Sequence, residues 1–117
     1  MALKEGKHIA LVSDAGTPLI SDPGYKFIKH ARESNIKVEP VPGCCALIAA
    51  ITSSGLPSDR FSFHGFLPRS ATKRINELNK ISDKEETLIF YESVHRIQSA
   101  IEDMISVFGG NRPAVLC

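Results

Sequence analysis

The chain has few residues of the kinds that build disulfide or metal sites. Only three of its 117 residues are cysteine, and the pair Cys44-Cys45 with the distant Cys117 forms neither a disulfide framework nor a C-x-x-C motif. The four histidines are scattered and lack the H-E-x-x-H spacing of a zinc site: His8, His30, His64 and His95. We therefore expect reduced, packed cysteines and no metal cofactor.

Long apolar runs and an excess of one charge are also absent. No apolar run approaches the roughly 20 residues that span a bilayer. The first residues, Met-Ala-Leu-Lys-Glu-Gly, are too charged for a signal peptide, so we expect a cytoplasmic protein. The net charge of +1 falls short of the strongly basic balance of a dedicated nucleic-acid module. Any RNA binding must therefore come from a local basic patch.

The common phosphate-binding and hydrolase motifs are missing too, namely G-x-G-x-x-G, G-x-x-x-x-G-K-[ST] and G-x-S-x-G. The chain has instead two glycine/proline turns, SDAGTPLISDPG at 13–24, directly after the apolar run 9–12. Gly16 is suited to a positive φ that lets a ligand approach the main chain. In open α/β sheets ligands lie beyond the carboxyl ends of strands, so this loop predicts a ligand site. Two ordinary surface turns are the alternative.

Strand and helix patterns alternate along the chain, which predicts an α/β fold with parallel β–α–β units. We expect strands at 9–12, 36–39, 61–66 and 87–91, and helices at 23–34, 44–54, from 70 onward and from 93 to 108. Asp22, Ser70 and Ser93 are the expected N-caps. The helix 44–54 is apolar nearly all round, so it is expected to be buried. A basic stretch after Phe66 suits a linker, which divides the chain into domains 1–66 and 67–117.

Four segments together resemble one family. They are ALVSDAGTPLISDPG at 10–24, VPGCCALIAAITSSGLPSDRF at 41–61, GFLPR at 65–69 and FYESVHR at 90–96. The sequence resembles the tetrapyrrole-methylase-like, S-adenosylmethionine-dependent methyltransferases, specifically those that methylate a cytidine ribose 2′-oxygen in small-subunit ribosomal RNA. The resemblance implies the end of one α/β domain and the start of a second, with the methyl donor held between them in a homodimer. It also implies a middle fragment of a longer chain, inactive alone.

Carried over by motif, the resemblance places donor contacts on residues of the first loop, of the start of the apolar helix and of the FYESVHR segment: Ala15, Gly16, Thr17, Ile20, Cys45, Ala46, Tyr91 and Glu92. Where related enzymes carry Gly-Asp-Pro, this chain has Gly16-Thr17-Pro18. The carry-over therefore assigns main-chain roles rather than side-chain roles. The helix start also offers unpaired N–H groups, although a simple core helix explains the same pattern.

Methyl transfer to a ribose hydroxyl needs a base but no metal. Asp14, Glu92 and His95 are candidates, and each is equally explained as a turn, cap or surface residue. Candidates for contact with RNA phosphates are the cations of the linker and of the FYESVHR segment, with a solvated basic face as the alternative: Arg69, Lys73, Arg74, His95 and Arg96. Two other functions stay open, a methylase of a porphyrinoid precursor and a non-catalytic donor-binding module.

Overall fold

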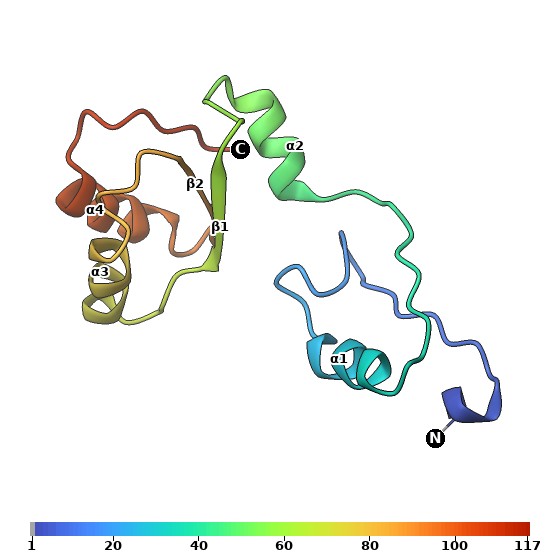
Figure 1. Cartoon of the computed structure of the whole chain (residues 1–117). Coiled ribbons are helices and arrows are strands. Elements are labelled where there is room, and N and C mark those ends of the chain that lie inside the picture. Colours follow the sequence, from blue (N-terminus) through green and yellow to red (C-terminus); the bar gives the residue numbers. More distant parts are fainter. Residues whose placement is uncertain (1) are drawn as a thin grey trace. The chain divides into compact units, whose positions relative to one another are not determined.

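The structure, a computed structural model, describes residues 2–117. Their contacts form two compact units that divide between Ala46 and Leu47 (Figure 1). The fold class is α/β, as the alternating pattern predicts, with helices and a small parallel sheet. The predicted domain division between residues 66 and 67 stays a prediction. None of the helices in residues 2–117 is long and apolar enough to cross a membrane.

The first unit contains a short 3₁₀ helix, η1 (Ala2–Glu5), and one α-helix, α1 (Tyr25–Glu33). The helix begins later than predicted, because Gly24 with φ 131° is its N-cap and Asp22 makes no cap hydrogen bond. Asp22 instead accepts a hydrogen bond from the hydroxyl of Ser13. As predicted, Asn35 ends the helix: it has φ 56°, and the next N–H, of Ile36, donates to the carbonyl of Ala31 at 3.0 Å. This is a complete Schellman ending.

The predicted strands at 9–12 and 36–39 do not form within the described residues of this unit. A strand needs a neighbour for its N–H and C=O groups, and no described segment pairs with either run. Apolar side chains of the first run are exposed as a result, with Val12 81% and Ile9 50% accessible. These two strand predictions are wrong for the chain as it stands.

The second unit contains a parallel β–α–β arrangement. Strand β1 (Phe61–Phe66) leads through α3 (Ala71–Asn79) to β2 (Thr87–Tyr91), and α4 (Ile97–Phe108) follows. The strands pair in parallel with Phe61 opposite Thr87, and the register shifts before Phe66, where Gly65 has φ 61°. The strands predicted at 61–66 and 87–91 are thus confirmed, as is the end of the last helix at Gly109.

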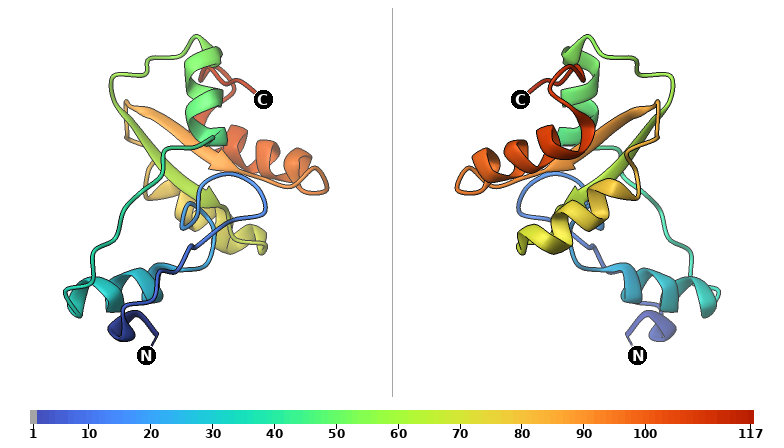
Figure 2. Two further views of the ribbon diagram at one scale, coloured as in Figure 1. Left: turned by 90° about the vertical axis from the view of Figure 1, so that its right-hand side faces the viewer. Right: turned by 90° about the vertical axis from the view of Figure 1, so that its left-hand side faces the viewer.

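Helices cover both faces of the two strands. Helices α3 and α4 lie on one side and α2 (Ala46–Ser54) lies on the other (Figures 1 and 2). Leu78 of α3 and Ala100 of α4 are completely buried where these helices pack together. Ser70 occupies the N-cap of α3 as predicted, although its side chain makes no cap hydrogen bond. For α4 the prediction of Ser93 is wrong, because Arg96 occupies the N-cap.

Helix α2 is less buried than its composition predicts. Leu47 and Ile51 point into the unit and are buried, whereas Ile48 is 46% exposed. The helix begins at Ala46 rather than Cys44 and is followed by Gly55 with φ 72°. A helix that is apolar all round contacts the two strands with only one face here, so its opposite face meets solvent.

Candidate functional site

The loop at 13–24 has an unusual main-chain conformation. Besides Gly16 with φ 86° and Gly24, two residues with side chains have positive φ values, Leu19 at 73° and Ser21 at 60°. Such values are uncommon away from glycine and persist only where surrounding contacts impose them. Contacts that fix the loop include the Ser13–Asp22 hydrogen bond and the N–H of Ile20, which donates to the carbonyl of Thr17 at 3.3 Å.

Thr17 joins this loop to the segment that precedes α2. Its hydroxyl donates to the carbonyl oxygen of Cys44 at 2.8 Å. A Cβ on Gly16 would lie 3.9 Å from the same oxygen, so the bend passes close to the segment that precedes α2 without crowding it. The structure therefore brings together two of the sequence motifs, SDAGTPLISDPG and VPGCCA. No sequence signal pointed to the side chain of Thr17 as their link.

The bend itself is open to solvent. Ala15, Gly16 and Ile20 are exposed, as is Asp14, and Thr17 is half-buried. On the adjoining segment Cys45 is half-buried and Ala46 is exposed. The bend is thus open to a ligand, although the carbonyls of Ala15 and Thr17 and the N–H of Ile20 already take part in hydrogen bonds within the loop.

Tyr91 lies at the end of β2, and both its hydroxyl group and its ring make contacts within the second unit. Its hydroxyl oxygen accepts a hydrogen bond from the backbone N–H of Leu47 in the first turn of α2, at 3.0 Å. Its ring packs edge-on against Phe63 and Phe66, with centroids 4.8 and 5.8 Å away. One of the free N–H groups expected at the start of α2 is therefore occupied by a phenol.

Glu92 and Arg96 form an ion pair inside the FYESVHR segment. The side chain of Glu92 is 4% exposed, and its Oε1 lies 2.6 Å from Arg96 Nη2 and accepts from the N–H of Ser93 at 2.7 Å. Its other oxygen, Oε2, is buried and has no partner among the described residues. His95, by contrast, is exposed. Of the base candidates in this segment, only His95 presents its side chain to solvent.

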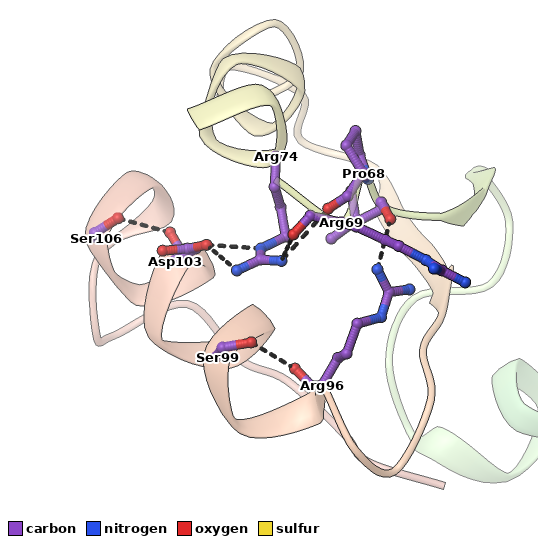
Figure 3. Close-up of polar contacts among 8 residues, drawn as sticks. Pro68, Arg69, Arg74, Arg96, Ser99, Asp103 and Ser106 are labelled. Carbon is purple, nitrogen blue, oxygen red and sulfur yellow. Dashed lines mark hydrogen bonds and ion pairs between the residues drawn. The ribbon is translucent and has the colours of Figure 1, made fainter. Parts of the chain in front are cut away.

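The cations assigned to RNA have very different surroundings. Arg69 and Lys73 are exposed, whereas Arg74 is 4% exposed and pairs through Nε and Nη2 with Oδ2 of Asp103, both at 2.6 Å (Figure 3). Its Nη1 points at the carbonyls of Pro68 and Arg69, at 3.4 Å. Arg74 has a structural role here, and it is left out of the RNA contacts proposed below.

Comparison with known proteins decides the family. The model of the tetrapyrrole (corrin/porphyrin) methylases matches residues 1–117. The chain belongs to the tetrapyrrole methylase family. It is 54% identical over 114 residues to the ribosomal RNA small subunit methyltransferase I of Pseudomonas aeruginosa and to that of Haemophilus influenzae, covering 97% of this chain and 40% of each relative. The Mesorhizobium japonicum relative of that name is 46% identical over 115 residues, covering 98% and 39%. The chain thus spans about 40% of these relatives' length.

This tetrapyrrole methylase segment also contains a polar cluster that the sequence motifs did not reveal. Ser62 Oγ lies 2.9 Å from His64 Nε2, and the His64 ring stacks on Phe90. Burial, then the charge of Lys84, lowers the pKa of His64 below its ordinary value, while Glu86 opposes the shift. Hydrogen bonds from Ser62 and Lys84 lower the pKa of Glu86.

One member of this cluster, Glu86, also lines an open cavity of about 350 Å³. The other lining residues are Pro57, Asp59, Arg60 and Glu85. The cavity contains none of the residues that the motifs of the tetrapyrrole methylases assign to a ligand. Within residues 2–117 no three of His, Cys, Asp and Glu gather in an arrangement that would hold a metal ion.

Proposed function

We propose that this chain forms part of an enzyme that transfers a methyl group from S-adenosylmethionine to the ribose 2′-hydroxyl of a cytidine in small-subunit ribosomal RNA. Family membership and the names of the relatives support a methyltransferase of ribosomal RNA. The observation that carries the proposal is the Thr17–Cys44 hydrogen bond, which joins the two motifs of the first unit beside an exposed glycine bend.

The proposed donor contacts are mainly main-chain contacts. In the first unit they fall on the exposed bend, where a glycine at φ 86° leaves room for close approach, and on the segment that Thr17 holds beside it. The residues are Ala15, Gly16, Thr17, Ile20, Cys45 and Ala46, with Tyr91 and Glu92 from the second unit. The surroundings of the bend fit such a ligand, because a donor with a positive sulfonium and little negative charge needs no cluster of cations to bind it.

The donor supplies an electrophilic methyl group and a neutral thioether leaving group, so the protein must align the 2′-oxygen and accept its proton. The side chain of Glu92 is only 4% exposed, and its Oε1 is engaged by Arg96 and by the N–H of Ser93. We therefore assign the base to Asp14 or His95, whose side chains are exposed. Asp14→Asn and His95→Gln separate them: the variant that removes the base lowers kcat by about 10²-fold or more with unchanged affinity for S-adenosylhomocysteine.

RNA is proposed to meet the exposed cations Arg69 and Lys73, together with His95. Arg96 is ion-paired with Glu92 and is not proposed as a phosphate contact. We propose further that the enzyme acts in the cytoplasm, as a homodimer and without a metal.

The decisive experiment measures transfer of a labelled methyl group to bare small ribosomal subunits by a protein of the relatives' length that carries these residues. We expect label on a cytidine ribose, and none when the 117 residues are supplied alone. Label on a base, or equal rates from the 117 residues, would contradict the proposal. Transfer to a porphyrinoid precursor but not to RNA would favour the alternative function, a methylase of such a precursor. Binding of S-adenosylhomocysteine without transfer to either would indicate a non-catalytic module.

A further inference from the structure

The linker that follows β1 has three successive carbonyl groups that receive side-chain hydrogen bonds. Arg96 Nη1 donates to the carbonyl of Leu67, and Arg74 Nη1 points at those of Pro68 and Arg69, each at 3.4 Å (Figure 3). The strand has ended at Phe66, so no ladder partner serves these groups, although Leu67 itself is buried. The carbonyl of the buried Leu67 needs a donor, and the two guanidinium groups supply donors to this carbonyl and to the less buried carbonyls of Pro68 and Arg69.

Each guanidinium is in turn fixed by a carboxylate. Asp103 of α4 holds Arg74 of α3 through two nitrogens, and Glu92 holds Arg96. The contacts to the carbonyls are long, so the two ion pairs determine where the guanidinium groups stand. We call the residues Arg74, Asp103, Glu92 and Arg96 the linker clasp. A planar fork with several donors suits this double task, and a lysine ammonium does not.

The clasp leaves the charged group of Arg69 outside its own contacts. The Arg69 side chain is exposed and extends away from the Arg74 guanidinium, while its own carbonyl is one of the groups held (Figure 3). We propose that the clasp fixes the linker backbone and thereby presents Arg69 to an RNA phosphate, with Arg74 and Arg96 acting as positioning residues. The RNA part of this inference rests on the proposed function, whereas the fixing of the backbone does not.

Limited trypsin digestion tests the fixing of the backbone in this chain itself. Trypsin cuts after Arg69, where the scissile carbonyl is the one that Arg74 faces, and cleavage requires local opening. Cleavage after the exposed Lys37, in the first unit, serves as the internal reference. We expect Asp103→Asn to accelerate cleavage after Arg69 by about tenfold or more relative to the reference.

A second variant separates positioning from stability. Replacing the pair by apolar residues, Arg74→Met with Asp103→Leu, removes the donors without leaving an unpaired buried charge. The fold should be retained, and cleavage after Arg69 should still be faster than in the unchanged chain. If cleavage after Arg69 is unchanged in this folded double variant, the clasp does not hold the linker and the inference is wrong.

Binding to bare small ribosomal subunits tests the presentation of Arg69, in a protein of the relatives' length. Arg69→Gln should reduce the slope of log affinity against log salt by about one, as expected for one lost phosphate contact. The Met/Leu pair should reduce it by a similar amount, and the combination should lose no more, because all act through one contact. Lys80→Gln, which removes a cation paired with Glu77 at the end of α3, is the control and should not change the slope.

The two parts of the test fail in different ways. Additive losses of Arg69→Gln and the Met/Leu pair would overturn the presentation of Arg69, even if the digestion result holds. Subunit binding that no variant changes would overturn it too, and it would count against the RNA contacts of the proposed function. Faster digestion after Arg69 in the folded double variant would still establish the clasp.

Discussion

The hydroxyl oxygen of Tyr91 accepts a hydrogen bond from the backbone N–H of Leu47, so the end of β2 is tied to the first turn of α2. Leu47 directly follows Ala46, one of the residues assigned to the donor. N–H groups of a first helical turn have no partner within the helix, and a phenol at the end of a strand satisfies one of them. Tyr91 thus links two family motifs within the second unit.

Tyr91→Phe should destabilise the second unit slightly. The change removes the hydrogen bond to Leu47 but keeps the ring against Phe63 and Phe66. We expect the free energy of unfolding in urea to fall by about 0.5–1.5 kcal/mol. Tyr91→Ala is the comparison, and it should cost about 3–5 kcal/mol because the aromatic contacts are lost as well. Equal losses in the two variants would mean that the hydroxyl, not the ring, carries the stability.

Asp103→Asn should destabilise the fold strongly, because Arg74 is buried and would lose its charge partner. Breaking a buried ion pair from one side costs about 3–5 kcal/mol, which is a large part of the stability of a small domain. Replacing both residues, Arg74→Met with Asp103→Leu, should recover most of that loss. Thermal unfolding of the single and double variants measures both effects. A double variant that is no more stable than Asp103→Asn would refute this account of the pair.

Secondary structure was predicted best from the sequence where the pairing partner of an element lies nearby in the chain. Strands β1 and β2 and the helix that crosses between them are close in the chain, so their patterns lead directly to a paired structure. The run 9–12 has an equally clear strand pattern, but no described residue pairs with it. A pattern of alternating or apolar residues indicates that a segment can pair, and it does not provide the neighbour.

The site was predicted unevenly for a related reason. The glycine bend and Cys45 could be proposed as donor contacts from motifs, because main-chain access depends on local residue types. The sequence places Arg74 in a basic group, since it does not show that Asp103, far along the chain, pairs with it. The Thr17–Cys44 link is hidden in the same way, because any hydroxyl in a loop can find many acceptors.

Thr17→Val should weaken binding of S-adenosylhomocysteine if the bend holds the donor. The variant keeps the shape of the side chain but cannot donate to the Cys44 carbonyl. Losing one such hydrogen bond costs about 0.5–1.5 kcal/mol, so the dissociation constant should rise by roughly 2- to 10-fold. Calorimetric titration of a protein of the relatives' length measures it, with Thr17→Ser as the control that keeps the hydroxyl. If valine binds as well as threonine, the link does not organise the donor site.

His64 should make the stability of the second unit depend on pH. Burial and the Lys84 charge lower its pKa in the folded state below the unfolded value of 6.5. The unfolded chain therefore binds more protons below this pH, so the stabilising contribution is complete above about pH 6.5 and declines as the pH falls through the folded pKa. Urea unfolding from pH 7.5 to 5 measures the decline, and His64→Gln should reduce it.

The neighbours of His64 give this prediction two opposite controls. Lys84→Gln removes the charge that lowers the pKa of His64, so the midpoint of its NMR titration should rise toward 6.5. Glu86→Gln removes the charge that raises it, so the midpoint should fall further. Burial is the largest cause, and neither variant changes it, so the midpoint should stay below 6.5 after Lys84→Gln. A midpoint above 6.5 in the unchanged chain would show that Glu86, rather than burial and Lys84, dominates the surroundings of the imidazole.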